Sequence, residues 1–309
     1  MTTPRRGAIR RALLASLTLA ATAAVAAPAV AAPGDPSTRL EGSGTSAASA
    51  DAAVAGANAA PSSCDGFSTY LDSNRRYGEI YLADGATYDY AWLVRDTGRL
   101  TYTPRAHTST HFADDGSGLT TYGYAVAPGG TVQRWTRVFS VSSESVRTYR
   151  QTVATGWRDV RAIAGNGSFL YALRGDQLHR YTIAADRRLT DEVVVGGGYG
   201  NLQTLSWTNG SATADTLVAA SRGGSLQRIK VSYRYPTTRN VAVLRRTGFA
   251  GFTSVSAGGC AGRATSLLAV SSTNRVYTFY DADGWDRDAE QAEGGLVGRV
   301  PTSYTVYSN

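Results

Sequence analysis

The chain has 309 residues, of which 42% are hydrophobic and 18% are charged. Its formal charge is +7, but four arginines lie within the first 31 residues, and the charge that remains without them is +3. A charge this small, on a domain of this size, does not indicate a nucleic-acid-binding protein.

The N-terminus has the pattern of a secretory signal peptide. Four arginines come before an Ala/Leu/Val run, and the segment contains no acidic residue. It ends in a triplet typical of a signal-peptidase cleavage site. We therefore expect residues 1–31 to be removed on export, by the ordinary secretory route or by the twin-arginine route. No second apolar run of membrane-spanning length follows, so we expect a secreted, extracellular protein without membrane insertion. The residues are Arg5, Arg6, Arg10, Arg11 and Ala29-Val30-Ala31.

Residues 32–63 consist almost entirely of Ala, Ser, Gly and Pro. Such a composition offers little to a hydrophobic core, so we expect this segment to be disordered in isolation. It is either a spacer or an arm that becomes ordered on a partner.

From Cys64 onward the chain changes to short runs rich in Tyr, Val, Thr and Trp, each closed by Gly, Asp, Asn or Pro. This pattern is typical of strands and turns. No sustained apolar period of 3.6 residues appears, so residues 64–309 are expected to form an all-β domain.

One hairpin recurs five times in this domain. Marker residues at Leu100, Val132, Leu178, Leu226 and Val276 give steps of 32, 46, 48 and 50 residues. A unit of about 50 residues with four strands is the size of a propeller blade, and five fit into residues 64–309. The predicted pairs are Trp92-Leu93-Val94 with Leu100-Thr101-Tyr102, Tyr124-Ala125-Val126 with Val132-Gln133-Arg134-Trp135, Tyr171-Ala172-Leu173 with Leu178-His179-Arg180-Tyr181, Leu217-Val218-Ala219 with Leu226-Gln227-Arg228-Ile229, and Leu268-Ala269-Val270 with Val276-Tyr277-Thr278-Phe279.

A second element precedes the last three hairpins. It is an aromatic residue followed at three and six positions by apolar side chains, and it begins at Trp157, Tyr199 and Phe249. Its recurrence in register with the hairpins supports a repeat architecture.

Cys64 begins the folded region and Cys260 lies in the last unit, before its inner hairpin. In an oxidising compartment the two should form a disulfide that joins the first blade to the last. The alternative is a pair of buried free thiols.

The run Phe169-Leu170-Tyr171-Ala172-Leu173, its Gly-Asp turn and Leu178-His179-Arg180-Tyr181 resemble the repeat of tachylectin-like propellers. The resemblance covers roughly residues 157–281 and is weak over 64–140. It implies a five-bladed propeller and amino-sugar binding, but transfers no sugar-contact residue.

The order of signal, Ala/Ser-rich arm and propeller also looks like the adaptor subunits of the umbrella-shaped toxin particles that streptomycetes secrete. That resemblance rests on layout. It implies an adaptor between a toxin backbone and a lectin-bearing, trypsin-like subunit, with the arm in the partner's cleft. Arg39, the basic residue of the arm, and Leu40 are the predicted partner contacts.

The sequence offers little catalytic chemistry. His107, His111 and His179 are the available bases, and none lies in a hydrolase motif. His179 occupies the position of Gln133 and Gln227, so we interpret it as a repeat residue, and His107 and His111 as residues of a surface loop. Neither a metal site nor a cofactor is predicted.

Five tryptophans are candidates for stacking on a sugar ring. Trp135 and Trp157 align with apolar positions of other blades and are expected in the core. Trp207 and Trp285 lie in or beside turns, which makes them the predicted ligand contacts.

Three functions remain. The hairpin turns differ from blade to blade, which favours a protein-docking adaptor in an extracellular, toxin-type complex over a glycan-binding lectin. A secreted propeller glycosidase is the third hypothesis; it requires two carboxylates facing one channel.

Overall fold

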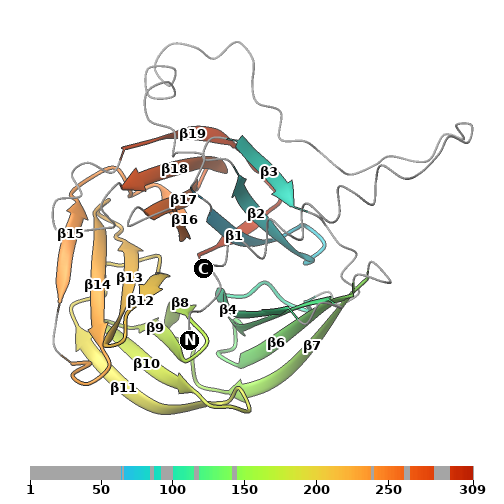
Figure 1. Cartoon of the computed structure of the whole chain (residues 1–309), viewed down its shortest axis with the longest axis vertical. Helices are drawn as coiled ribbons and strands as arrows, with labels where there is room; N and C mark the ends of the chain where they lie inside the picture. The colour runs from blue at the N-terminus through green and yellow to red at the C-terminus, as the bar shows by residue number, and fades with distance from the viewer. Residues whose placement is uncertain are drawn as a thin grey trace, which may run out of the picture. The chain divides into compact units, whose positions relative to one another are not determined.

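The computed structural model describes residues 64, 66–83, 87–91, 100–114, 118–140, 145–237, 240–260, 265–281 and 293–308. These residues form five four-stranded antiparallel sheets. Figure 1 shows the sheets arranged around a common centre like the blades of a propeller, each with one strand near the centre and one at the rim. The predicted all-β, five-bladed propeller is thereby confirmed. The predicted signal peptide and arm, residues 1–63, lie outside the described residues.

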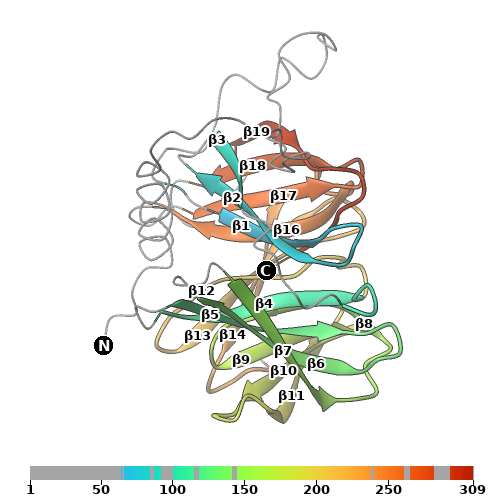
Figure 2. The ribbon, with the colours of Figure 1, turned by 90° about the vertical axis from the view of Figure 1, so that its right-hand side faces the viewer.

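Each blade runs from an inner to an outer strand, and the side view in Figure 2 shows the strands of the orange-red sheet lying side by side. In the described part of the chain, no helix has the length and apolarity needed to cross a membrane. From centre to rim the strands are β20 (Thr305–Tyr307), β1 (Gly66–Leu71), β2 (Tyr77–Ala83) and β3 (Thr87–Ala91) in blade 1; β4 (Ala106–Asp114), β5 (Gly118–Val126), β6 (Val132–Ser140) and β7 (Ser145–Ala154) in blade 2; β8 (Val160–Gly165), β9 (Phe169–Arg174), β10 (Gln177–Ile183) and β11 (Leu189–Gly197) in blade 3; β12 (Ser206–Gly210), β13 (Ala214–Ala220), β14 (Leu226–Ser232) and β15 (Val241–Arg245) in blade 4; and β16 (Phe252–Gly259), β17 (Thr265–Ser271), β18 (Arg275–Asp281) and β19 (Glu293–Arg299) in blade 5.

The ring is closed because strands from the two ends of the domain pair with each other. The C-terminal strand β20 pairs antiparallel with β1, with Thr69 opposite Tyr307 and Leu71 opposite Thr305. The last strand of the chain therefore becomes the inner strand of the first blade. This pairing covers the inner edge of β1 and gives blade 1 four strands, like the other blades.

Four of the five predicted inner hairpins are confirmed as β5–β6, β9–β10, β13–β14 and β17–β18. The prediction for blade 1 is wrong. Its inner hairpin is β1–β2, in which Leu71 pairs with Tyr77, whereas Leu100 lies outside any strand. Residues 92–94, the other half of the predicted pair, are outside the described residues.

A single hydrogen bond recurs in all five blades. Where the chain leaves the outer strand, a backbone N–H returns to a carbonyl in the inner hairpin turn of the same blade. Trp157, Tyr199 and Phe249 are three of the donors, so the predicted aromatic element is confirmed as a repeat feature. Leu100 supplies the equivalent N–H in blade 1. It is therefore a repeat position, although it is not, as the sequence predicted, the first residue of a hairpin strand. The five pairs are Leu100 to Arg75, Trp157 to Gly130, Tyr199 to Asp176, Phe249 to Gly224 and Val300 to Asn274, at 2.9–3.2 Å.

The hydrophobic core lies between neighbouring blades. Trp157, Val160 and Ile163 pack between blades 2 and 3, and Tyr199 with Leu202 between blades 3 and 4. Similar clusters lie between blades 4 and 5 and between blades 5 and 1. Each sheet thus has both of its faces buried against neighbouring blades. This explains why its strands have continuous apolar runs in the sequence.

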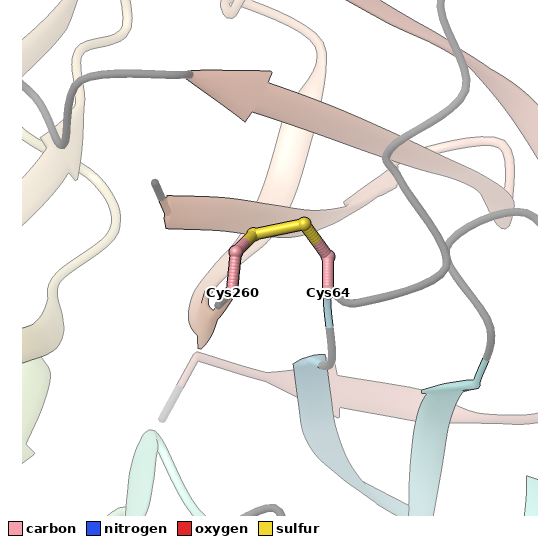
Figure 3. The surroundings of a disulfide bond; sticks show 2 residues. All are labelled: Cys64 and Cys260. Carbon is pink, nitrogen blue, oxygen red and sulfur yellow. A yellow bond between two sulfur atoms is a disulfide. The ribbon is translucent and has the colours of Figure 1, made fainter. Parts of the chain in front are cut away.

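The predicted disulfide is confirmed. Cys64 lies before β1 of blade 1 and Cys260 follows β16 of blade 5, with an S–S distance of 2.05 Å. Figure 3 shows the bond joining the two segments. It ties together the same two blades that β20 closes.

Candidate functional site

The histidines are placed differently from the prediction. His107 and His111 both belong to strand β4, not to a surface loop. His107 is buried, and its Nδ1 lies 3.0 Å from Oγ1 of Thr69. Burial in the apolar surroundings of the blade 1–blade 2 interface, together with the charge of Arg137, lowers the pKa of His107 to about 3. It is therefore a neutral core residue, and the loop interpretation was wrong because the apolar alternation of this strand is masked by Thr and Ser.

A surface pocket of about 550 Å³ lies on blade 3, the yellow-green sheet of Figure 1, at the end that carries the β9–β10 hairpin. The hairpin is one residue shorter than those of the other blades. Arg174–Gln177 separate the paired residues Leu173 and Leu178, whereas Ala127–Thr131 separate Val126 and Val132. The pocket is lined by Asp159, Arg174, Gly175, Asp176, Gln177, His179, Glu192 and Gly197.

Arg174 is fixed in the wall of this pocket by five groups. One is the backbone carbonyl of Gly156, which accepts from Nη2 of Arg174 at 3.3 Å. Its Nε donates to Oδ1 of Asp159 at 3.3 Å, and its Nη1 donates to the Tyr181 hydroxyl at 2.8 Å and to Oε1 of Glu192 at 3.4 Å. Its guanidinium lies 5.5 Å from the centre of the Trp157 ring. Since Trp157 begins the repeated crossing segment, the fold itself positions the arginine.

Glu192 is the carboxylate on which three side chains converge. Nδ1 of His179 and the Tyr181 hydroxyl both lie 2.7 Å from its Oε1. Because an ionised carboxylate can only accept a hydrogen bond, Nδ1 of His179 must carry the hydrogen that is donated to Glu192. Partial burial works to raise the pKa of Glu192, but the hydrogen bonds from Tyr181 and His179 and the charges of His179 and Arg174 outweigh it and hold that pKa below its usual value.

Asp176 closes the other side of the pocket. Its carboxylate accepts hydrogen bonds from the N–H groups of Gly198 at 2.9 Å and Gly200 at 2.7 Å. These two bonds lower the pKa of Asp176. The loop after β11 is thus held against the hairpin, and the carboxylate stays ionised at neutral pH.

The equivalent positions in the other blades carry different chemistry. In blade 3, Arg174 comes directly after Leu173, the residue paired with Leu178 across the hairpin. The residues at the same position in the other blades are Asp72, Ala127, Ser221 and Ser271. His179 does align with Gln133 and Gln227, each opposite an alanine of the neighbouring strand, so its interpretation as a repeat residue is confirmed. Its role in the pocket was not predicted.

Of the four contact residues predicted from the sequence, Trp207 is the one that the structure describes. Arg39, Leu40 and Trp285 are outside the described residues. Trp207 lies in the inner strand β12, packs against the core between blades 3 and 4, and donates from Nε1 to Oδ1 of Asp215 at 2.9 Å. Trp135 and Trp157 are buried, as predicted. The sequence signal that marks the pocket is the short Arg174-Gly175-Asp176 turn, which is one residue shorter than the turns of the other blades.

In the described residues, no group of three or more His, Cys, Asp and Glu side chains is placed to hold a metal ion. The pocket groups that contact one another are instead arranged as alternating donors and acceptors: Asp159, Arg174, Glu192 and His179. Such an arrangement can bind a polar ligand through several directed hydrogen bonds.

No protein-family model matches the chain, and no curated protein matches it. Solved structures of similar fold include a triple arginine-to-alanine variant of AofleA from Arthrobotrys oligospora (11% identity, TM-score 0.44, covering 74% of this chain and 67% of that one). They also include the lectin BP39L from Burkholderia pseudomallei (14% identity, TM-score 0.40, 80% and 69%). A third is the catalytic domain of a GH62 α-L-arabinofuranosidase from Coprinopsis cinerea (11% identity, TM-score 0.43, 72% and 73%). At these identities the likeness is one of fold alone, and the three structures include a lectin and an enzyme.

Proposed function

We propose that the chain is a secreted carbohydrate-binding protein and that the pocket on blade 3 holds the ligand. The observation that carries this proposal is the pocket itself: about 550 Å³ lined by charged and amide side chains. This volume lies in the range of small-molecule sites. The Cys64–Cys260 disulfide supports export, because such bonds persist in oxidising compartments.

The side chains of the pocket are held in place before any ligand arrives. Arg174 is fixed by Asp159, Tyr181 and Glu192, and His179 is fixed by Glu192. A preorganised set of directional groups lowers the entropic cost of binding, and sugar hydroxyls can pair with both carboxylates and amides. Because the pocket is lined by residues of blade 3 and its crossing segment, we propose one site per chain.

The charges of the pocket support binding over hydrolysis. A glycosidase needs one carboxyl group with a raised pKa to act as general acid. Here Asp159 and Glu192 are both paired with Arg174, and the pKa of Glu192 is lowered. Two carboxylates that share one arginine are suited to fixing a ligand.

The test is a glycan array followed by calorimetry of each hit. Asp159→Ala removes a half-exposed carboxylate from the pocket and should weaken binding about 10-fold, the equivalent of one lost charged hydrogen bond. Arg222→Ala, at the corresponding hairpin of blade 4, is the matched control and should bind like the wild type. Equal losses in both variants, or no bound glycan, would exclude the blade 3 pocket as a sugar site.

A protein-docking adaptor is the second candidate. The exposed rings of Tyr149 and Tyr235, at 56% and 58%, support it, because exposed tyrosines are enriched at protein interfaces. Arg234 stacks on Tyr235 at 5.1 Å and forms a compact aromatic and cationic projection. Affinity purification from culture medium tests this reading, with the full chain compared to a chain that lacks residues 32–63. An adaptor should lose at least one protein partner with that segment, whereas recovery of both forms as lone monomers would count against it.

A further inference from the structure

Between Glu192 and Asp281 the chain has one acidic residue and nine basic ones. This stretch runs through blade 4 and the first three strands of blade 5. The acidic residue, Asp215, is fully buried and accepts hydrogen bonds from four side chains. The accessible charges of blade 4 are therefore all positive, although the charge of the whole domain is small. The basic residues are Arg222, Arg228, Lys230, Arg234, Arg239, Arg245, Arg246, Arg263 and Arg275.

Four arginines of blades 4 and 5 lie at the end of the propeller where the inner hairpins turn, which we call the hairpin face. Arg245 is the last residue of β15 and Arg246 follows it, at the end that carries the β13–β14 turn. Arg275 begins β18 and Arg299 ends β19, at the end that carries the β17–β18 turn. Figure 1 shows the two blades as neighbours in the ring.

The acidic residues that the structure describes in these two blades lie towards the opposite end. Asp215 is the second residue of β13, Asp281 is the last of β18, and Glu293 is the first of β19. Strands of seven residues separate them from the hairpin face by about 17–20 Å. This is too far for an ion pair with any of the four arginines.

The segment that crosses from blade 4 to blade 5 joins the two groups of arginines. The N–H of Phe249 donates to the carbonyl of Gly224 in the blade 4 turn at 2.9 Å, and the N–H of Ser272 in the blade 5 turn donates to the carbonyl of Gly251 at 2.8 Å. Both turns thus contact one crossing segment, which begins at Arg246. A ligand that follows the hairpin face across this boundary meets arginines from both blades.

Arg275 and Arg299 lie directly opposite each other in the β18–β19 ladder. Opposite residues of antiparallel strands point to the same side of the sheet, and like charges at such positions are destabilising. That side faces blade 4, because Tyr277, two residues after Arg275, packs against the cluster between blades 4 and 5. A pair that works against stability is expected where the charges serve a function.

The surface at this boundary is open and polar. Arg246 and Arg299 are exposed, and neither forms an ion pair within the described part of the chain. Val243 of β15 is an exposed hydrophobic residue nearby, but it alternates with Leu244, which packs towards blade 5, so it points to the other side of the sheet. Stable protein interfaces have an apolar centre, which this surface lacks.

We propose that the boundary between blades 4 and 5 on the hairpin face binds a polysaccharide that carries sulfate, phosphate or carboxylate groups. Arginine presents a fixed fork of donors that matches such anions. Arginines spaced along rigid strands suit the repeated charges of an extended polymer, which needs no apolar centre to bind. This surface is separate from the blade 3 pocket, and the inference goes beyond the function proposed for that pocket.

The experiment is calorimetry of the full chain with dextran sulfate, polygalacturonate and neutral dextran of similar chain length. At least one acidic polymer should bind about 10-fold or more tightly than dextran, and which one binds identifies the anion. Raising the salt from about 50 to about 200 mM should weaken this binding about 10-fold or more, because each contact releases a counterion. Binding of none of the three, or equal binding of dextran, overturns the proposal. Polyglutamate or a DNA duplex that binds more tightly than both acidic polysaccharides would overturn the assignment to a polysaccharide.

Two double variants that remove the same charge test the residues. Arg246→Ser with Arg299→Ser should weaken binding of the acidic polymer about 10-fold. Arg147→Ser with Arg188→Ser removes two exposed arginines of blades 2 and 3 and should bind like the wild type. Equal losses in both would mean that overall charge attracts the polymer, and would overturn the assignment to this surface.

A thermal melt separates binding from folding. Arg299→Ser alone relieves the like-charge pair, so its midpoint of unfolding should equal or exceed that of the wild type while binding weakens. Weaker binding together with a lower midpoint would mean that Arg299 acts through the fold, and would overturn its role as a contact. Asp159→Ala, in the blade 3 pocket, should leave binding of the acidic polymer unchanged, so this proposal and the pocket proposal fail independently.

Discussion

The hydroxyl of Tyr171 donates a 2.6 Å hydrogen bond to Oδ2 of Asp215, and this contact joins blade 3 to blade 4. Asp215 is fully buried. Its Oδ1 accepts from Asn166 and Trp207 at 2.9 Å and from Tyr233 at 3.0 Å. Burial raises the pKa of Tyr171 and raises that of Tyr233 to about 12, so both phenols remain donors at any physiological pH.

We therefore predict that Asp215→Asn lowers the free energy of unfolding by about 3 kcal/mol, because four donors lose a buried anionic acceptor. Urea denaturation at neutral pH measures this. The exposed Asp191→Asn is the control and should change stability by less than about 0.5 kcal/mol. Similar losses in both variants would contradict a special role for the buried carboxylate.

The β5–β6 turn provides a matched pair of glycines. Gly130 has φ +82°, and a Cβ added there would lie 2.6 Å from the backbone nitrogen of Arg158, whereas at Gly129 nothing lies within 4 Å. Gly130→Ala should cost about 1–3 kcal/mol of stability, since it strains the turn and presses on the crossing segment. Gly129→Ala should be close to neutral in the same thermal melt. A neutral Gly130→Ala would mean that the recurring turn-to-crossing contact contributes little.

His107 makes stability depend on pH in a defined direction. Its pKa is about 3 in the folded chain, and about 6.5 is expected in the unfolded chain. Between these values only the unfolded chain takes up the proton, so the contribution is full above about pH 6.5 and falls by up to about 1.4 kcal/mol per unit as the pH drops. Denaturation at several pH values should show a shallower slope for His107→Gln. His111→Gln, in the same strand, is the control, and an unchanged slope in His107→Gln would contradict the prediction.

The disulfide should contribute stability chiefly through the unfolded chain. Cys64 and Cys260 are 196 residues apart, and the chain-entropy model gives up to about 5 kcal/mol for a loop of this length. Replacing both by Ser should lower the midpoint of thermal unfolding. A reductant should destabilise the wild type but leave the double variant unchanged. If the wild type is equally stable with and without reductant, closure by β20 suffices by itself.

The repeats in the sequence determined the fold class and the blade number, and the presence of two cysteines in an expected secreted chain predicted the disulfide. Apolar pairs such as Leu173 and Leu178 must face neighbouring blades to be buried, so their spacing is visible along the chain. Blade 1 escaped detection for a physical reason. Its inner strand Thr305–Tyr307 comes from the other end of the chain, and its crossing residue Leu100 is aliphatic where three other blades have an aromatic ring.

The candidate site depended on tertiary structure. Asp159, Arg174 and Glu192 come from a crossing segment, a hairpin and an outer strand, and no local period brings them together. Trp207 also depends on tertiary contacts. Its ring is partly buried against the core between blades 3 and 4, and its Nε1 donates to the buried carboxylate of Asp215. Local patterns report which residues must be buried, whereas the pairing of polar groups is decided only when distant strands meet, because a hydrogen bond depends on position and direction and hydrophobic burial does not.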